Sequence, residues 1–60
     1  MTGDLVAEKY ELDLKITRLF EFMCKPEFES LAYTPRSLIS NQYQTMCTYS
    51  GILSLRIQLK

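Results

Sequence analysis

The side chains of this chain that could do chemistry are its cations and its tyrosines. Lysine and arginine neutralise phosphate groups, and the planar fork of arginine matches two phosphate oxygens at once. Tyrosine rings can stack on nucleobases. The seven cations are Lys9, Lys15, Arg18, Lys25, Arg36, Arg56 and Lys60, and the four tyrosines are Tyr10, Tyr33, Tyr43 and Tyr49. This set is able to bind a phosphorylated, base-containing ligand, but composition alone more often reflects scattered surface cations and half-buried tyrosines.

Catalytic and metal-binding side chains are poorly represented. The chain has no His, the residue that most often serves as a general acid or base near neutral pH. Cys24 and Cys47 would become nucleophiles only beside a group that lowers the thiol pKa, and the local sequence shows none. We expect both to be buried and to behave as small apolar residues. Two cysteines without His do not complete a four-ligand zinc site. We therefore expect no catalytic residue, no metal and no cofactor.

Charge and hydropathy narrow the partners further. The formal net charge is zero, whereas general DNA-binding proteins usually carry a basic excess. Binding of a small anionic ligand needs only a few local cations, so it is compatible with a net charge of zero. No run approaches the roughly 20 apolar residues of a membrane span. No secretory leader is evident, and we expect a soluble protein inside the cell.

Two segments with apolar residues at steps of three and four must position these side chains, and such steps are typical of α-helices. The first helix is expected over about residues 4–24, which contain no Gly or Pro. Lys9 interrupts its inner stripe, which consists of Leu5, Leu12, Ile16, Leu19 and Met23. Further apolar residues widen the surface beyond one stripe: Val6, Tyr10, Leu14, Phe20 and Phe22. We interpret the extra width as a face for a second subunit.

A proline ends the first helix and another starts the second. Pro26 follows Lys25 and is expected to start a short turn over residues 26–31, with Phe28 and Leu31 facing inward. Thr34 is expected to cap a second helix over about residues 35–58, with Pro35 at its first position. Its inner face should comprise Ile39, Gln42 or Tyr43, Met46, Tyr49, Leu53, and Arg56 or Ile57. Gly51 either lets another backbone approach or lies on a solvated side.

The expected fold is all-α: a single helical-hairpin domain over residues 1–60. One alternative remains open, because the apolar residues of 52–60 partly alternate and could form a terminal strand paired with another subunit. Sixty residues bury only about 60% of their unfolded surface, and one core of this size seldom supplies more than about 3–5 kcal/mol. We therefore expect self-association into a homo-oligomeric helical bundle.

The hairpin should gather the candidate binding residues at its two ends. Lys25 and Arg36 flank the connector and should lie together at one end. Arg56 should return to the opposite end, near Lys9 and Tyr10. In a symmetric assembly, cations from several copies would converge there.

The order and spacing of these residues resemble a family of small phage proteins. Its pattern reads E-K-x-x-L-D-x-K-I-x-x-L-x-x-F, then F-x-x-L, then L-L-x-x-Q-x-x-x-M-x-x-Y-x-x-I-L-x-x-R-I. The matching residues, across about residues 8–57, are Glu8, Lys9, Leu12, Asp13, Lys15, Ile16, Leu19, Phe22, Phe28, Leu31, Leu38, Ile39, Gln42, Met46, Tyr49, Ile52, Leu53, Arg56 and Ile57. Ile39 stands where the pattern has its second leucine.

This family is similar to the hairpin domain of phage anti-CBASS and anti-Thoeris proteins. Those proteins sequester the nucleotide signals of bacterial immunity without cleaving them, and the better-known relatives are hexamers with pockets between subunits. The resemblance implies a homo-oligomer in the host cytoplasm that binds a cyclic oligonucleotide or a cyclic ADP-ribose-type signal. Phosphate would be held by Arg56 and Lys9, with Tyr10 stacking on a base and Lys25 or Arg36 acting at the other end. Only Lys9 and Arg56 among these lie on motif positions.

A second hypothesis needs no nucleotide. The extra apolar face could dock on a host or phage protein, so that the chain would be a small oligomeric interaction or structural module of a phage. A stoichiometric protein partner without a nucleotide would favour this hypothesis.

Overall fold

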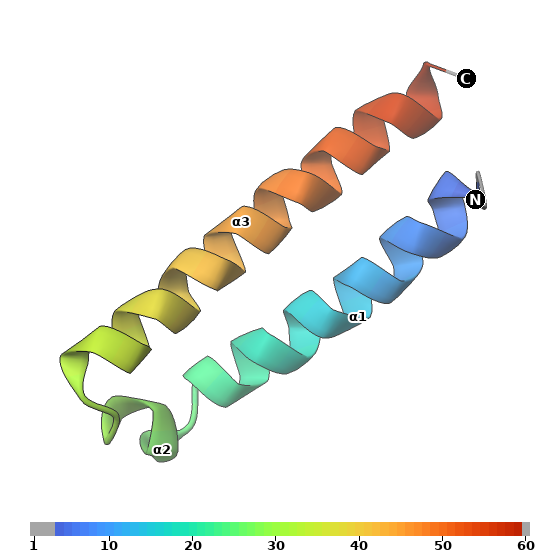
Figure 1. Cartoon of the computed structure of the whole chain (residues 1–60). Helices are drawn as coiled ribbons and strands as arrows, with labels where there is room; N and C mark the ends of the chain where they lie inside the picture. The colour runs from blue at the N-terminus through green and yellow to red at the C-terminus, as the bar shows by residue number, and fades with distance from the viewer. Residues whose placement is uncertain (1–3, 60) are drawn as a thin grey trace.

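The computed structural model describes residues 4–59, which form a helical hairpin. Its elements are α1 (Leu5–Met23), α2 (Pro26–Glu29) and α3 (Tyr33–Gln58). α1 and α3 run antiparallel side by side, α2 closes one end, and the start of α1 and the end of α3 lie at the other (Figure 1). The described chain measures 43 × 19 × 15 Å along its principal axes. The expected all-α hairpin with a short helical turn is confirmed.

Local sequence accounts for the ends of α1 and for α2. The Asp4 side chain accepts a hydrogen bond from the Ala7 amide at 3.1 Å and so caps the start of α1. Pro26 occupies the first turn of α2, where an amide hydrogen is not required. The backbone of Lys25 is extended, as expected before a proline. The chain therefore leaves α1 and turns back within a few residues.

The expected start of the second long helix is wrong by two residues. α3 begins at Tyr33, and its capping residue is Ala32, which contributes no side-chain hydrogen bond. Thr34 is therefore inside the helix and not its cap. Pro35 is tolerated at the third helical position because the first amides of a helix have no partner within it. The result places Tyr33 in the first turn of α3.

The strand alternative for the last residues is also wrong, because α3 continues to Gln58. Leu53 and Ile57, four residues apart, both turn inward, while Leu55 is exposed. Apolar residues therefore alternate in the sequence of this segment although the segment is helical. Lys60, the last residue of the expected strand, lies outside the described residues.

The seam between α1 and α3 holds a small core. Leu53 is fully buried, Phe28 is 9% exposed, and the only other buried residue described is Ser50. The half-buried residues that flank them include Leu5, Lys9, Leu12, Ile16, Leu19 and Phe22 on α1, and Ile39, Tyr43, Met46 and Ile57 on α3. Of the two candidates Gln42 and Tyr43, Tyr43 faces inward. Of the candidates Arg56 and Ile57, Ile57 faces inward. Tyr49, expected inward, is 39% exposed.

The prediction that both cysteines are buried is wrong for this chain. Cys24 and Cys47 are exposed free thiols. Cys24 caps the end of α1, and Cys47 is exposed on α3 beside Tyr43. Gly51 is exposed, and a Cβ added there would meet nothing within 4 Å, so no described part of the hairpin itself approaches it closely.

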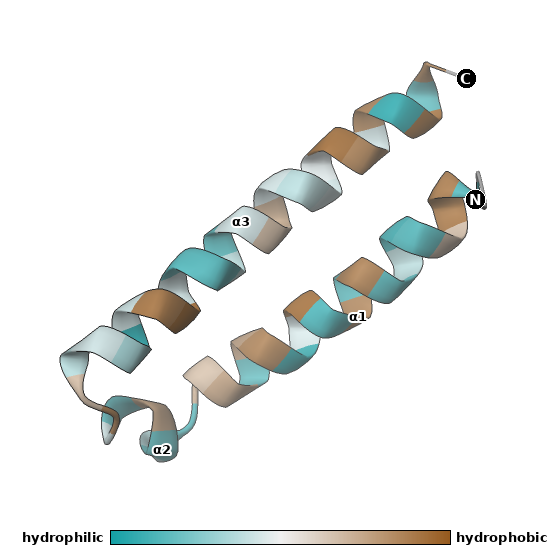
Figure 2. Cartoon of the chain, viewed as in Figure 1, coloured by the Kyte–Doolittle hydropathy of each residue, from teal (hydrophilic) through white to brown (hydrophobic). Residues whose placement is uncertain are grey.

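Much apolar surface remains uncovered. Hydrophobic positions recur along both arms and are not confined to the seam (Figure 2). Ten large apolar side chains are between 39 and 85% exposed: Val6, Tyr10, Leu14, Phe20, Tyr33, Leu38, Tyr49, Ile52, Leu55 and Leu59. No helix within residues 4–59 has the length and hydropathy that crossing a membrane requires.

Candidate functional site

A hollow of about 660 Å³ lies at the closed end of the hairpin. It is an open depression, and the end of α1, the α2 turn and the first turns of α3 form its walls. Its lining residues are Met23, Phe28, Glu29, Tyr33, Arg36, Ser37, Ser40 and Asn41. The volume lies within the usual range for small-molecule sites, which is about 300–1,000 Å³. This hollow is the candidate binding site.

The α2 turn forms one wall and is held by short-range contacts. The Phe28 amide donates to the Lys25 carbonyl at 3.0 Å, and the Leu31 amide donates to the Phe28 carbonyl at 3.1 Å. The Phe28 ring meets Phe22 of α1 edge-on, with ring centroids 6.0 Å apart and planes at 84°. Edge-to-face contact is a favoured geometry for aromatic pairs. Phe28 therefore gives the hollow a fixed apolar wall.

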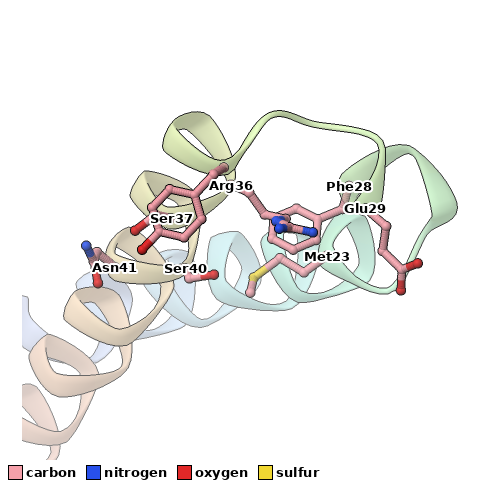
Figure 3. Close-up of a pocket in the computed structure, with 8 residues that line it drawn as sticks. Met23, Phe28, Glu29, Arg36, Ser37, Ser40 and Asn41 are labelled. Atoms are coloured by element: carbon pink, nitrogen blue, oxygen red, sulfur yellow. The ribbon is translucent and has the colours of Figure 1, made fainter.

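Among the described residues, Arg36 is the only cation that lines the hollow. Its side chain extends from α3 toward Phe28, while the Glu29 carboxylate points away from it (Figure 3). Among the described residues no ion pair or hydrogen bond engages the Arg36 guanidinium. The side chain is half-buried, which partly removes it from water. Its five donors are therefore available to a bound anion.

The other walls can serve an aromatic, hydroxyl-rich ligand. Tyr33 is 75% exposed at the rim, where its ring face is accessible. Ser37, Ser40 and Asn41 follow on the same side of α3 and carry donors and acceptors. Glu29 can accept hydrogen bonds from hydroxyl or amino groups. The arrangement can hold phosphate, stack on a ring and hydrogen-bond to its edge.

Lys9 lies in a hydrogen-bonded cluster midway along the seam. Its ammonium donates to Asp13 Oδ2 at 2.7 Å and to Ser50 Oγ at 3.0 Å. Ser50 in turn donates to Asp13 Oδ1 at 2.6 Å. The bond from Lys9, followed by that from Ser50, lowers the pKa of Asp13 below its usual value. A phosphate approaching Lys9 would have to share it with Asp13.

The remaining sequence-predicted residues do not line the hollow. Tyr10 is 65% exposed on α1, and Arg56 is exposed in the last turn of α3. Within residues 4–59, no hydrogen bond or ion pair joins Arg56 to Lys9 or to Tyr10. Lys25 is exposed at the start of α2 and does not line the hollow, whereas Arg36 does.

Another contact between the arms involves Tyr49. Its hydroxyl donates to the Glu8 carboxylate, and this bond raises the pKa of Tyr49. In a second contact between the arms, the Tyr43 ring of α3 packs at a tilt on the Phe20 ring of α1, with ring centroids 6.0 Å apart. The hydrogen bond between Tyr43 and Cys47 raises the pKa of Tyr43. Both tyrosines therefore serve the hairpin, and neither lines the hollow.

Sequence reasoning missed four polar or aromatic lining residues of α3: Tyr33, Ser37, Ser40 and Asn41. Their spacing of four, three and one places them on one side of a helix, together with Arg36. Arg36, Ser37, Ser40 and Asn41 lie within the expected helix, so their shared side could be recognised from the sequence. Only Tyr33 was hidden, because the expected start at Pro35 left it in the connector.

A comparison with protein families identifies the chain. The family model described as Sequestin matches residues 3–59, which is nearly the whole sequence. Searches among curated proteins and among solved structures found no match. The hairpin is therefore a member of the Sequestin family.

Proposed function

We propose that this chain is a phage anti-defence protein that binds and sequesters a cyclic nucleotide signal of bacterial immunity without hydrolysing it. Sequestin membership suggests a protein that acts by holding a signal molecule and not by catalysis. The ligand class comes from the resemblance to anti-CBASS and anti-Thoeris proteins: a cyclic oligonucleotide or a cyclic ADP-ribose-type molecule. The single structural observation that supports it is an unengaged Arg36 in a hollow of about 660 Å³.

Capture requires affinity and no transition-state stabilisation. The Arg36 guanidinium would hold a phosphate through two parallel hydrogen bonds. Tyr33 would stack on a base, a contact worth about 1–3 kcal/mol per base. Ser37 and Asn41 would bond to base edges or sugar hydroxyls. Lys25, exposed at the same end, would add long-range attraction for the anion.

The open end of the hairpin supplies a second proposed contact. Arg56 and Tyr10 are exposed there and could hold phosphate and stack on a base if copies of the chain bring them together. Lys9 would join them only by loosening its bond to Asp13. In a homo-oligomer, such as a hexamer, each end would be present once per copy.

The proposal is tested by isothermal titration of the purified chain with cyclic dinucleotides, cyclic trinucleotides and cyclic ADP-ribose isomers. We expect saturable binding of at least one of them. After heat denaturation of the complex, chromatography should return the ligand chemically unchanged. If no nucleotide of the panel gave a heat of binding or raised the melting temperature of the protein, sequestration of this ligand class would be contradicted. Recovery of a cleaved ligand would show an enzyme instead.

One observation favours the alternative of a protein-interaction module. Ten large apolar side chains are exposed, more than a stable isolated hairpin would be expected to carry. Affinity capture from infected cells would distinguish the two functions. One stoichiometric host or phage protein, together with silence in the nucleotide titrations, would favour the interaction module.

A further inference from the structure

One flank of α1 carries a stripe of charges whose sign changes at its middle. The stripe is spaced by four and three residues, which keeps it on one side of a helix. Its acidic half is Glu8 and Glu11, and its basic half is Lys15 and Arg18. We call this set the α1 charged stripe.

The α1 charged stripe is symmetric about position 13. Glu11 and Lys15 lie two residues to either side of it, and Glu8 and Arg18 lie five residues to either side. A two-fold axis across the helix at this level runs a second α1 antiparallel to the first. Each acid then faces a cation of the other copy at the same height, in both pairs at once. A parallel arrangement would instead place like charges opposite each other.

The charges of the stripe are available for such pairing. The ion pair described within residues 4–59 joins Lys9 to Asp13, neither of which belongs to the stripe. Glu11, Lys15 and Arg18 are exposed, and none has an ion-pair partner among the described residues. Glu8 accepts a hydrogen bond from Tyr49, but a carboxylate has about four acceptor sites and retains others.

The surface beside the stripe is hollowed on both halves. Beside the basic half, a groove of about 370 Å³ is lined by Lys15, Arg18, Leu19, Phe22, Gln42 and Met46, so its base is largely apolar. Beside the acidic half, a groove of about 280 Å³ is lined by Asp4, Ala7, Glu8 and Glu11. If two copies met about this two-fold axis, the acidic side chains of each copy would lie over the apolar groove of the other. The cations Lys15 and Arg18 line that groove.

We propose that a second copy of this chain docks antiparallel on the α1 charged stripe, with Glu8 and Glu11 of each copy facing Arg18 and Lys15 of the other. The self-complementary charge order selects a second copy over an unrelated partner. Electrostatic complementarity of this kind fixes register and excludes wrong arrangements. The contact requires no ligand, so it goes beyond the proposed function and is independent of it.

Two charge-reversal variants test the contact by light scattering in low salt without nucleotide. Glu8→Lys/Glu11→Lys makes the stripe wholly basic, and Lys15→Glu/Arg18→Glu makes it wholly acidic. We expect each variant alone to lose at least half of the parent's assembly mass. An equimolar mixture should recover the parent's mass, because all four cross-pairs are again opposite in sign. Glu27→Lys/Glu29→Lys changes net charge by the same amount on α2 and should keep the parent's mass.

Circular dichroism of each variant separates loss of contact from loss of fold. If a double reversal unfolds, the pair Glu11 and Lys15 is tested alone. Glu11→Lys and Lys15→Glu should each lower the mass, and the combined exchange, which preserves composition, should restore it. A monomeric parent, folded reversals with unchanged mass, or a mixture or exchange that restores nothing would each overturn the proposal.

Discussion

Lys9 on α1 donates a hydrogen bond to Ser50 on α3, across 3.0 Å and between residues 41 positions apart in the chain. Ser50 is also bonded to Asp13, so the three side chains close a cluster across the seam. A seam with one fully buried apolar side chain has little shape of its own to fix how the arms slide. The cluster ties α3 to α1 at this level of the seam through the two hydrogen bonds of the Ser50 hydroxyl.

Ser50→Ala removes two hydrogen bonds to charged groups and should lower the stability of the hairpin by at least about 1.5 kcal/mol, the lower end of the range for one such bond. For a domain of this size each 1 kcal/mol of lost stability lowers the melting temperature by about 4–8 °C. Ser54→Ala, one turn further along α3 and without a described hydrogen bond, is the matched control. Thermal unfolding followed by circular dichroism measures both. Equal effects of the two variants would show that the cluster does not stabilise the seam.

Acid should weaken the hairpin partly through Asp13. Its pKa is lowered in the folded chain, first by the bond from Lys9 and then by that from Ser50. The unfolded chain, with a pKa of about 3.9, therefore takes up the proton first. Stability due to this group is fully present above that value and is lost as pH falls through the lower, folded pKa. Urea midpoints from pH 7 to pH 2 should fall less steeply for Asp13→Asn than for the parent. Parallel slopes would contradict this role.

Leu53→Ala should remove most of the folded population of the isolated chain. Leu53 is the one fully buried side chain among the described residues, and such truncations cost about 2–5 kcal/mol. That loss is comparable with the total that a single small core supplies, about 3–5 kcal/mol. Leu53→Ile nearly conserves volume and should cost below about 1.5 kcal/mol. Far-ultraviolet circular dichroism in dilute solution compares them, and full helicity of Leu53→Ala would mean that other contacts hold the arms.

The sequence predicted the helical parts well because their signals are local. The signals are the helix breaks at Pro26 and near Pro35 and the apolar steps of three and four. They act within a few residues and do not depend on tertiary contacts. The strand alternative arose because Leu55, Ile57 and Leu59 alternate over a stretch too short to separate the two periods. Lys9 was interpreted as an interruption of the apolar stripe. Its partner Ser50 is distant in the sequence, and no periodicity reveals a polar pair across a seam.

The candidate site was only partly predictable for a related reason. Arg36 and Lys25 were expected at one end because the connector brings them there, and Arg36 does line the hollow. The wall opposite depends on how Phe28 packs against Phe22, which is a tertiary contact. The expected burial of the cysteines failed because a small apolar residue is buried only if its helix face meets a partner. Cys47 is exposed on α3 because no described residue of the single chain covers its side of the helix.

Substitutions of Arg36 test whether the hollow at the closed end of the hairpin binds the ligand. Arg36→Lys keeps the charge but loses the planar fork, so it should weaken a phosphate contact less than Arg36→Ala does. The loss expected for Arg36→Ala is about 1.5–3 kcal/mol, or roughly 10–100-fold in dissociation constant. Circular dichroism should show no loss of helix, since no described residue pairs with Arg36. Equal affinities of the parent and both variants would exclude Arg36 from the site.

The most direct measurement is calorimetric titration of the parent, Arg36→Ala and Arg56→Ala with whichever cyclic nucleotide of the panel binds the parent. If capture occurs in the closed-end hollow, Arg36→Ala should lose at least tenfold in affinity while Arg56→Ala retains the parent's value. Loss in Arg56→Ala alone would move the site to the open end. Failure of every nucleotide to bind the folded parent would contradict sequestration itself.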